Sequence, residues 1–214
     1  MKSEASEKPL SAKARVRREN TRKIIIAAEE VFSKKGFEGA TTREIAATAG
    51  LPKANVHYYF PTKEDLYVRV LEDILKEWIA DAEIFDISSD PETVFRAYIE
   101  RKIQHSFTRP FGSKVWAMEI ISGGQVFETH LKQSLLKWNA KTIQQISDWI
   151  AEGKLRPINP QYLLYAIWAT TQHYADFEYQ IRAINRGKPL SPKQTNEIVD
   201  NIVQIVLHGV LPGV

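Results

Sequence analysis

Two short stretches of helical sequence meet at Gly50, and their spacing constrains the fold more than any other feature of the chain. Thr41 can cap the first stretch, and Glu44 stands three residues later, which is the spacing of a capping box. Gly50 supplies a tight turn, and Pro52 suits the first position of a second helix over about residues 53–59. This layout is typical of a helix-turn-helix, whose second helix lies in the major groove of DNA.

Polar side chains around this turn are of the kinds that contact DNA. The outward positions of the second helix carry amine, amide, imidazole and phenol groups, which reach phosphates and base edges. Another helix is expected to begin after Thr62, and its first residue adds a cation beside the motif. The residues expected to contact DNA in this segment are Thr41, Thr42, Lys53, Asn55, His57, Tyr58 and Lys63.

The same segment resembles the DNA-binding region of the TetR family of bacterial repressors, whose pattern runs T-x-x-x-I-A-x-x-A-G-V-S-x-x-x-x-Y-x-Y-F-x-x-K-E-x-L. The sequence departs from it where Pro52 replaces the usual serine cap and where His57 replaces the common first tyrosine. An ordinary helical hairpin is the alternative. It is disfavoured, because a chance match over so many spaced positions is improbable. The matching residues are Thr41, Ile45, Ala46, Ala49, Gly50, Tyr59, Phe60, Lys63, Glu64 and Leu66.

Basic residues concentrate around this motif. Residues 1–60 carry 12 Lys and Arg against 7 Glu, a net charge of +5. The remaining residues carry 17 Lys and Arg against 19 Asp and Glu, a net charge of −2. We expect a flexible basic arm over residues 1–17 to contact DNA, with Arg17 and Arg18 among the contacting residues. A solvated tail that only aids solubility is the alternative, and the neighbouring motif favours DNA contact.

Composition excludes several other classes of protein. The chain contains no cysteine, so neither a disulfide nor a thiolate metal site is expected. It has no run of about 18 uncharged apolar residues that would span a membrane, and its first twenty residues have no apolar core of a secretory signal. We therefore expect a cytoplasmic protein.

Catalytic motifs are absent from the sequence. No G-x-S-x-G, H-E-x-x-H, P-loop or strand-associated G-x-G-x-x-G pattern occurs. The five histidines show no i, i+4 pair for a metal. We expect a protein that is not an enzyme and that holds no metal or other cofactor.

Helical periodicity runs through nearly the whole chain, and strand signals are almost absent. We expect an all-α protein of about nine helices, divided into the arm at 1–17, a three-helix DNA-binding domain at 18–64 and a second helical domain at 65–214. The helices are expected at about 13–35, 42–49, 53–59, 63–82, 91–108, 113–121, 125–151, 160–185 and 192–209.

The last two of these helices are apolar over unusually wide faces. In the helix at 192–209, three isoleucines form one stripe and three valines form the next, which is wider than one core contact requires. A homodimer that packs two helices from each chain would use both stripes, with Ile202 and Val206 near its centre. A fully internal core is the alternative. The family resemblance implies dimerisation through such terminal helices.

One segment inside this apolar region is polar. Trp168 and Gln172 lie one turn apart and suit a ligand pocket, since an indole stacks on a flat molecule and an amide pairs with its edge. His173 and Asp176 lie beside them, and the sequence leaves open whether they line the pocket or the dimer interface. The residues expected to bind an effector are Trp78, Trp116, Glu119, Trp168, Gln172 and His173.

The segments around residues 116, 155 and 170 further resemble those of a regulator of pyrimidine utilisation within this family. That resemblance implies a repressor released from double-stranded operator DNA by uracil, thymine or a related pyrimidine catabolite, with Trp78, Trp168 and Gln172 at the matching pocket positions. A glutamine amide complements half of a uracil edge, although many small planar amides offer the same edge. A DNA-binding regulator with an unrelated effector, or with none, is the alternative.

Overall fold

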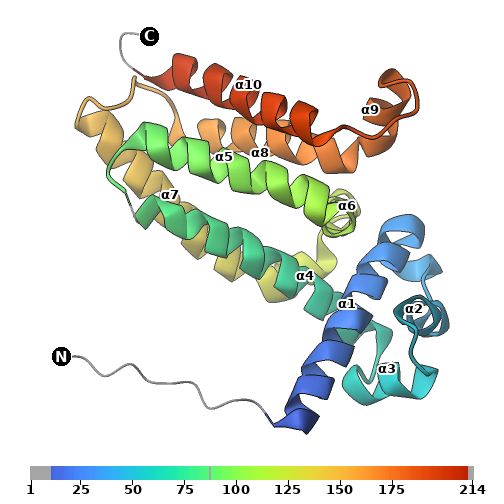
Figure 1. The fold of residues 1–214 in the computed structure, drawn as a ribbon. Coiled ribbons are helices and arrows are strands. Elements are labelled where there is room, and N and C mark those ends of the chain that lie inside the picture. The colour runs from blue at the N-terminus through green and yellow to red at the C-terminus, as the bar shows by residue number, and fades with distance from the viewer. Residues whose placement is uncertain (1–10, 87, 212–214) are drawn as a thin grey trace. The chain divides into compact units, whose positions relative to one another are not determined.

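The computed structural model describes residues 11–86 and 88–211, and these residues form an all-α protein without strands (Figure 1). The fold class expected from periodicity is therefore confirmed. A 3-10 turn (η1, Ala82–Asp86) and a π-helical turn (η2, Phe127–Leu131) accompany ten α-helices. The α-helices are α1 (Ala12–Gly39), α2 (Thr42–Ala49), α3 (Lys53–Tyr59), α4 (Lys63–Asp81), α5 (Pro91–Thr108), α6 (Pro110–Ile121), α7 (Lys132–Ala151), α8 (Pro160–Asp176), α9 (Glu178–Ile184) and α10 (Pro192–Val210).

Several helices differ from their expected extents. Helix α6 begins at Pro110 instead of about 113, and the π-helical turn η2 lies within the helix expected at 125–151. The regular backbone of α1 is interrupted at Gly36, whose φ of 68° and ψ of 176° suit glycine, so the expected break is present although helix resumes to Gly39. The expected single helix at 160–185 is instead two helices, because Phe177 leaves helical geometry at φ −108° and ψ 25°. Neither glycine nor proline marks that position, so the sequence carried no signal for the extra break.

The described chain forms two compact units, the first ending at Val70 and the second beginning at Leu71. The first unit packs α1 against α2 and α2 against α3. Its core includes the fully buried Ile24, Ile45 and Val56, and Phe32 meets Tyr67 edge to face with ring centroids 4.9 Å apart. These contacts fix the two short helices of the motif on a rigid base.

The second unit is built around α5, which contacts α6, α8, α10 and η1 (Figure 1). The α5 stripe that includes Phe95, Ile99 and Ile103 is fully buried. Phe95 also meets Trp149 of α7 with ring centroids 5.9 Å apart. A central helix surrounded by others positions side chains from several helices around one interior.

The described residues contain neither a membrane-spanning helix nor a cluster of metal ligands. No described helix is long and apolar enough to cross a membrane. Nor do residues 11–86 and 88–211 bring together three or more side chains that would hold a metal ion.

Candidate DNA interface and effector pocket

The turn between α2 and α3 has the geometry that its sequence predicts. The Glu44 N–H donates to the Thr41 hydroxyl at 3.2 Å, which caps α2. Gly50 adopts a left-handed φ of 65°, and the Leu51 N–H reaches back to the Ala46 carbonyl at 3.0 Å. Pro52 precedes α3 and provides no side-chain cap, so the departure from the usual serine leaves this helix start without one.

The α3 helix has a polar outward face and an apolar inward face that is buried. Val56 and Phe60 are buried, whereas Lys53, His57 and Tyr58 are exposed, Tyr58 to 73%. Asn55, also expected on the DNA face, is half-buried. The outward side chains have room to reach a groove, because the apolar residues hold the helix from behind.

Two of the expected α2 residues lie beside this face. Thr42 is half-buried, and its hydroxyl lies 3.5 Å from the His57 imidazole Nε2. Thr41 is exposed at the start of α2 while it caps that helix. The start of α2 and the outward face of α3 therefore form one continuous polar surface.

Lys63 has a role that the sequence did not reveal. Its ammonium group donates to the carbonyls of Phe37, Glu38 and Ala40 at 2.6, 3.4 and 3.1 Å, and lies 4.3 Å from the centroid of the Phe37 ring. These carbonyls end α1, where a cation is favourable. All three N–H donors are engaged within the protein, which favours a structural role over the phosphate contact expected from sequence.

Lys63→Met is accordingly expected to loosen the first unit by about 1–2 kcal/mol, the contribution of charged hydrogen bonds at a helix end. Native-state hydrogen exchange of amides in residues 24–66 measures this change directly. Lys34→Met is the matched control, since Lys34 pairs with Glu30 at 2.6 Å on the exposed surface and should cost only ~0.3–0.5 kcal/mol. Unchanged protection together with weaker binding to every duplex would restore the phosphate-contact interpretation.

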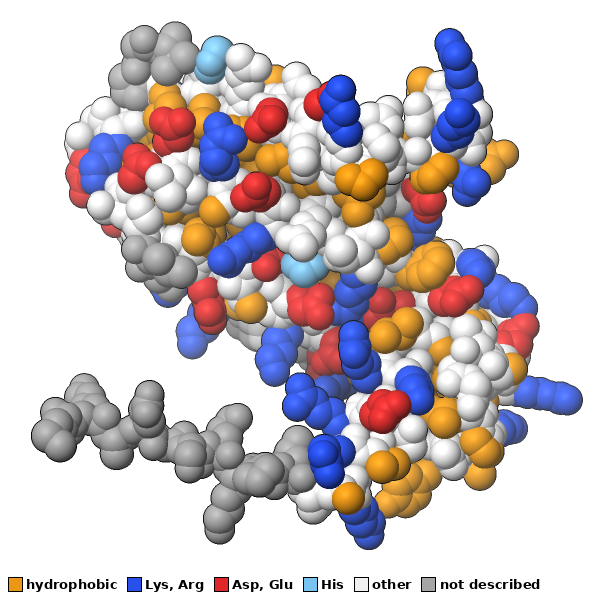
Figure 2. All heavy atoms as spheres, in the orientation of Figure 1, with side chains coloured by type: hydrophobic (Ala, Val, Ile, Leu, Met, Phe, Trp, Pro, Cys, Tyr) orange, Lys and Arg blue, Asp and Glu red, His pale blue; other side chains and the backbone are white. Residues whose placement is uncertain are grey.

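Basic side chains of α1 lie on the surface of the same unit. Arg17 and Arg18 are exposed, and neither is within ion-pair distance of a carboxylate in the described part of the chain. Figure 2 shows Lys and Arg side chains along α1 on the face in view. Residues 12–17, assigned from sequence to the arm, are helical in α1, and residues 1–10 of that arm lie outside the described residues.

An aromatic cavity with about 70 Å³ of free space lies in the second unit. Four of the five tryptophans of the chain line it, and two pairs of them are in contact: Trp78 with Trp116 at 5.1 Å between centroids, and Trp138 with Trp168 at 5.6 Å. The side-chain amide of Gln172 adds a polar group to this aromatic lining. Trp78, Trp116, Trp168 and Gln172, which sequence selected from three separate helices, are therefore together in one wall.

Tyr98 and Trp138 belong to this cavity and were not foreseen. The Trp168 indole N–H donates to the Tyr98 hydroxyl at 3.0 Å, and burial raises the pKa of Tyr98, so the phenol stays neutral. The buried indole N–H of Trp138 has no hydrogen-bond acceptor among the described residues. Since a buried donor normally has a partner, this donor is left unsatisfied by the protein alone.

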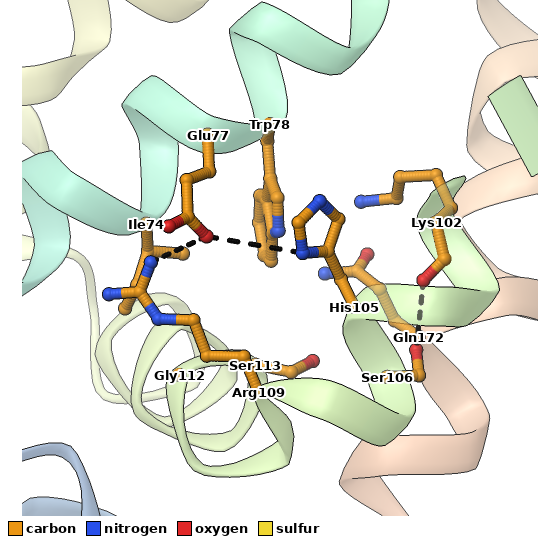
Figure 3. A pocket seen from close by; sticks show the side chains of 10 residues that line it. All are labelled: Ile74, Glu77, Trp78, Lys102, His105, Ser106, Arg109, Gly112, Ser113 and Gln172. Carbon is orange, nitrogen blue, oxygen red and sulfur yellow. Dashed lines mark hydrogen bonds and ion pairs between the residues drawn. The ribbon is translucent and has the colours of Figure 1, made fainter. Parts of the chain in front are cut away.

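A smaller cavity, with only about 10 Å³ of free space, shares Trp78, Lys102 and Gln172 with the aromatic one. Figure 3 shows its side chains converging from α4, α5 and α8. On its α4 side, the Arg109 guanidinium lies 2.6 Å from the Glu77 carboxylate. This polar cavity is distinct in chemistry from its aromatic neighbour.

Lys102 is the main residue that sequence reasoning missed. It is 4% exposed, and its ammonium lies 4.0 Å from the centroid of the Trp78 ring. Burial lowers the pKa of Lys102 to about 8, against the opposing effect of Asp81 and Asp176. A signal was present, because Lys102 lies three and four residues after the buried Ile99 and Tyr98 and so interrupts the apolar stripe of α5.

Two expected effector residues lie elsewhere. Glu119 is buried but accepts hydrogen bonds from the N–H groups of Val126 and Phe127 at 2.8 and 3.1 Å, which caps the following helix. His173 is exposed on α8 and stacks on Phe177 with centroids 4.8 Å apart. Neither residue lines the two cavities described above.

Asp176, whose place the sequence left open, is partly buried. The Ser113 hydroxyl donates to its carboxylate at 2.7 Å. Burial raises the pKa of Asp176, and this hydrogen bond opposes the change. Ser113 lines the smaller cavity, so Asp176 supports the cavity wall from behind.

The apolar stripes of α10 do not both face outward. Ile202 and Val206, expected at the centre of a dimer interface, are 7% and 8% exposed inside the second unit. Ile205 is 72% exposed, and on α8 Tyr162 and Tyr165 are 68% and 52% exposed. The expected centre is therefore corrected, since most of the α10 face fills the core of its own chain.

Comparison with known proteins gives two adjoining family matches. Residues 24–70 match the model described as bacterial regulatory proteins, tetR family, and residues 71–213 match that described as YcdC-like protein, C-terminal region. The HTH-type transcriptional regulator RutR of Escherichia coli (strain K12) is 36% identical over 189 residues, which cover 88% of this chain and 89% of RutR.

Solved structures share the fold at lower identity. The ketosteroid transcriptional regulator KstR2 of Mycobacterium tuberculosis is 17% identical with a TM-score of 0.70, covering 89% of this chain and 94% of KstR2. AibR, solved in complex with isovaleryl coenzyme A and operator DNA, is 18% identical with a TM-score of 0.64, covering 87% and 97%. The matched family consists of transcriptional regulators, not enzymes, that bind operator DNA and small effectors. The chain therefore belongs to the TetR family of bacterial DNA-binding transcriptional regulators, with a YcdC-like C-terminal region.

Proposed function

We propose that this regulator is a repressor that binds operator DNA as a homodimer and is released by a small planar effector of the pyrimidine type. The observation that carries the effector proposal is the enclosure of one cavity by four tryptophans and the amide of Gln172. Aromatic faces favour a flat ligand, and an amide favours a hydrogen-bonding edge. The cavity, with about 70 Å³ of free space, suits a one-ring compound and not a ligand as large as an acyl coenzyme A.

DNA reading is proposed to rest on α3, with α1 supplying phosphate contacts. Lys53→Ala and Asn55→Ala are expected to relax sequence preference at a cost of ~1–3 kcal/mol for each lost base contact. Arg17→Ala should instead weaken binding to all duplexes alike and lower the slope of the salt dependence by about 1. Selection from a random duplex pool, followed by titration at several salt concentrations, measures both effects. Enrichment of no palindromic site would exclude the proposed mode of binding.

A dimer is supported by the exposed aromatic and aliphatic side chains of α8 and α10. Tyr162, Tyr165 and Ile205 leave apolar area open to solvent, and a symmetric interface buries the same patch from both chains. Two recognition helices at a fixed separation then match two half-sites of an operator. The interface proposed here uses Ile205 in place of the buried Ile202 and Val206.

Effector binding is proposed to act through α4. Trp78 lines both cavities, and it lies on the same helix as Lys63, about four turns further along. A ligand that displaces Trp78 changes the end of a helix whose start belongs to the first unit. DNA release then requires only that the ligand bind more tightly to the form that does not bind DNA.

The effector proposal is tested by isothermal titration of the purified protein with uracil and thymine. Native mass spectrometry of freshly purified protein provides a second observation, since it detects a small molecule retained in the cavity. No heat with any pyrimidine and no retained ligand would exclude this class of effector.

A further inference from the structure

The ammonium group of Lys102 lies where the two cavities of the second unit meet. Lys102 lines both cavities, together with Trp78 and Gln172. The side chain enters from α5, the central helix, so its position is fixed by the core on either side. Figure 3 shows Lys102 among the side chains that line the smaller cavity, and the same residue lines the aromatic one.

Two carboxylates act electrostatically on Lys102, and each lies against another group, although Oδ2 of Asp81 is buried without a hydrogen bond. The Asp81 carboxylate lies 2.6 Å from Nε2 of His105. The Asp176 carboxylate accepts from Ser113 at 2.7 Å. Within residues 11–86 and 88–211, the Lys102 ammonium forms no hydrogen bond or ion pair, and it lies 4.0 Å from the centroid of the Trp78 ring. A buried cation normally has a hydrogen-bonded counter-ion, so this one is poised to receive an anion.

The walls of the cavities include donors that have no acceptor in the described part of the protein. The Trp138 indole N–H is buried without an acceptor in the described part of the chain, and the Trp168 N–H is already used by Tyr98. Lys102 supplies up to three further N–H donors and no acceptor. A ligand that satisfies these groups must bring an excess of acceptor oxygens, as a carboxylate does and a neutral ring with balanced donors does not.

We propose that the effector carries a carboxylate, which pairs with Lys102 at the junction while the planar amide part of the molecule stacks among the tryptophans. This inference rests on the proposed effector function and narrows it to acidic compounds, such as a pyrimidine carboxylate or a ureido acid. The carboxylate is placed on the side of the smaller cavity, which Lys102, Ser106 and Ser113 line. The larger cavity receives the flat part of the molecule.

Three related compounds separate charge from shape. Uracil has the ring without the acid, orotate adds a carboxylate to that ring, and methyl orotate carries the same substituent as a neutral ester. We expect wild-type protein to bind orotate at least tenfold more tightly than uracil or methyl orotate in calorimetric titrations. Binding of uracil or the ester as tightly as orotate would overturn the proposal while leaving a pyrimidine effector intact.

Variants of Lys102 test the partner of the carboxylate. Lys102→Met is expected to remove the advantage of orotate and to change uracil binding by less than threefold, whereas Lys102→Arg should keep a preference for the acid. Lys114→Met is the matched control, because Lys114 pairs with Glu178 at 2.8 Å and lines neither cavity. An orotate preference that persists in Lys102→Met would assign the anion to another residue and refute the proposal.

A pH series on wild-type protein keeps the test independent of how the variants fold. Because the pKa of Lys102 is about 8, its charge is present below that pH and is lost above it. The tenfold advantage of orotate should therefore decline between pH 7 and pH 9, and a constant advantage would contradict it. No heat from any of the three compounds would instead refute the pyrimidine-type effector itself. The ionisable groups around Lys102 are Glu77 and Asp81 of α4, His105 of α5, Arg109 between α5 and α6, and Asp176 of α8.

Discussion

Ile205→Glu is expected to yield a monomer that binds a palindromic operator about 10²- to 10⁴-fold more weakly than the wild-type protein, because linked half-site binding is lost. Ile205 is 72% exposed on α10, so the substitution leaves the core of its own chain unchanged. In a symmetric dimer, two such glutamates would be buried near each other without counter-ions. Sedimentation velocity measures the oligomeric state, and fluorescence anisotropy with labelled operator measures the affinity.

Two further substitutions on the same helix serve as controls. Ile202→Glu buries a charge inside the protomer and is expected to cost about 4 kcal/mol or more, so it should unfold the second unit. Lys193→Glu changes a side chain that is 88% exposed at the start of α10, and it should leave the dimer intact. Sedimentation of the wild-type protein as a monomer at micromolar concentration would contradict the proposed dimer.

Local signals in the sequence predicted most helix starts correctly. Thr41, Asp90 and Ser191 each accept a backbone N–H at the helix start that their residue type favours. The donor and the acceptor of such a cap lie within four residues of each other, so both can be identified from the sequence. The break at Phe177 had no such local signal and was missed, although the adjoining helices were found.

Tertiary contacts decided what the sequence left open. Lys63 matched a DNA-binding motif, yet its ammonium is held by carbonyls more than twenty residues earlier in the chain. On α10, hydropathy alone does not distinguish a face that fills the protomer core from one left exposed, which is why Ile202 and Ile205 were assigned to one stripe. Long-range packing determines both the contacts of Lys63 and the burial of each α10 face. Sequence periodicity does not report such packing.

Only part of the cavity lining was predicted, because long-range packing also decides which side chains face the cavity. Trp78, Trp168 and Gln172 were selected by residue type and by resemblance, and they share one cavity. Glu119 was selected by proximity in sequence to Trp116, but its carboxylate turns to cap a neighbouring helix. Lys102 was passed over because a lysine on a helix is usually solvated, and only its place in a buried stripe marked it.

Gln172→Ala and Trp168→Ala are expected to abolish the release of operator DNA by a planar pyrimidine effector while leaving DNA affinity without effector unchanged. Gln172 lines both cavities, and Trp168 lines the aromatic one. Both substitutions should therefore weaken ligand binding, and neither changes a residue of the DNA-binding unit. Trp168→Phe is the milder companion, because it removes the hydrogen bond to Tyr98 but keeps an aromatic face. Anisotropy titrations of operator with and without effector measure the response.

The expected size of this response follows from linkage. An effector that prefers the released form by ~2–3 kcal/mol per dimer weakens DNA binding by roughly thirty- to a hundredfold, and by reciprocity operator DNA weakens effector binding by the same factor. Calorimetric titration of the effector into the protein, with and without operator, therefore measures the coupling twice by independent routes. Four tryptophans line the cavity, so quenching of their fluorescence gives a third measurement of the same affinity. Unchanged effector affinity in both Gln172→Ala and Trp168→Ala would move the pocket elsewhere in the second unit. Equal affinities with and without operator would mean that the cavity binds its ligand without regulating DNA binding.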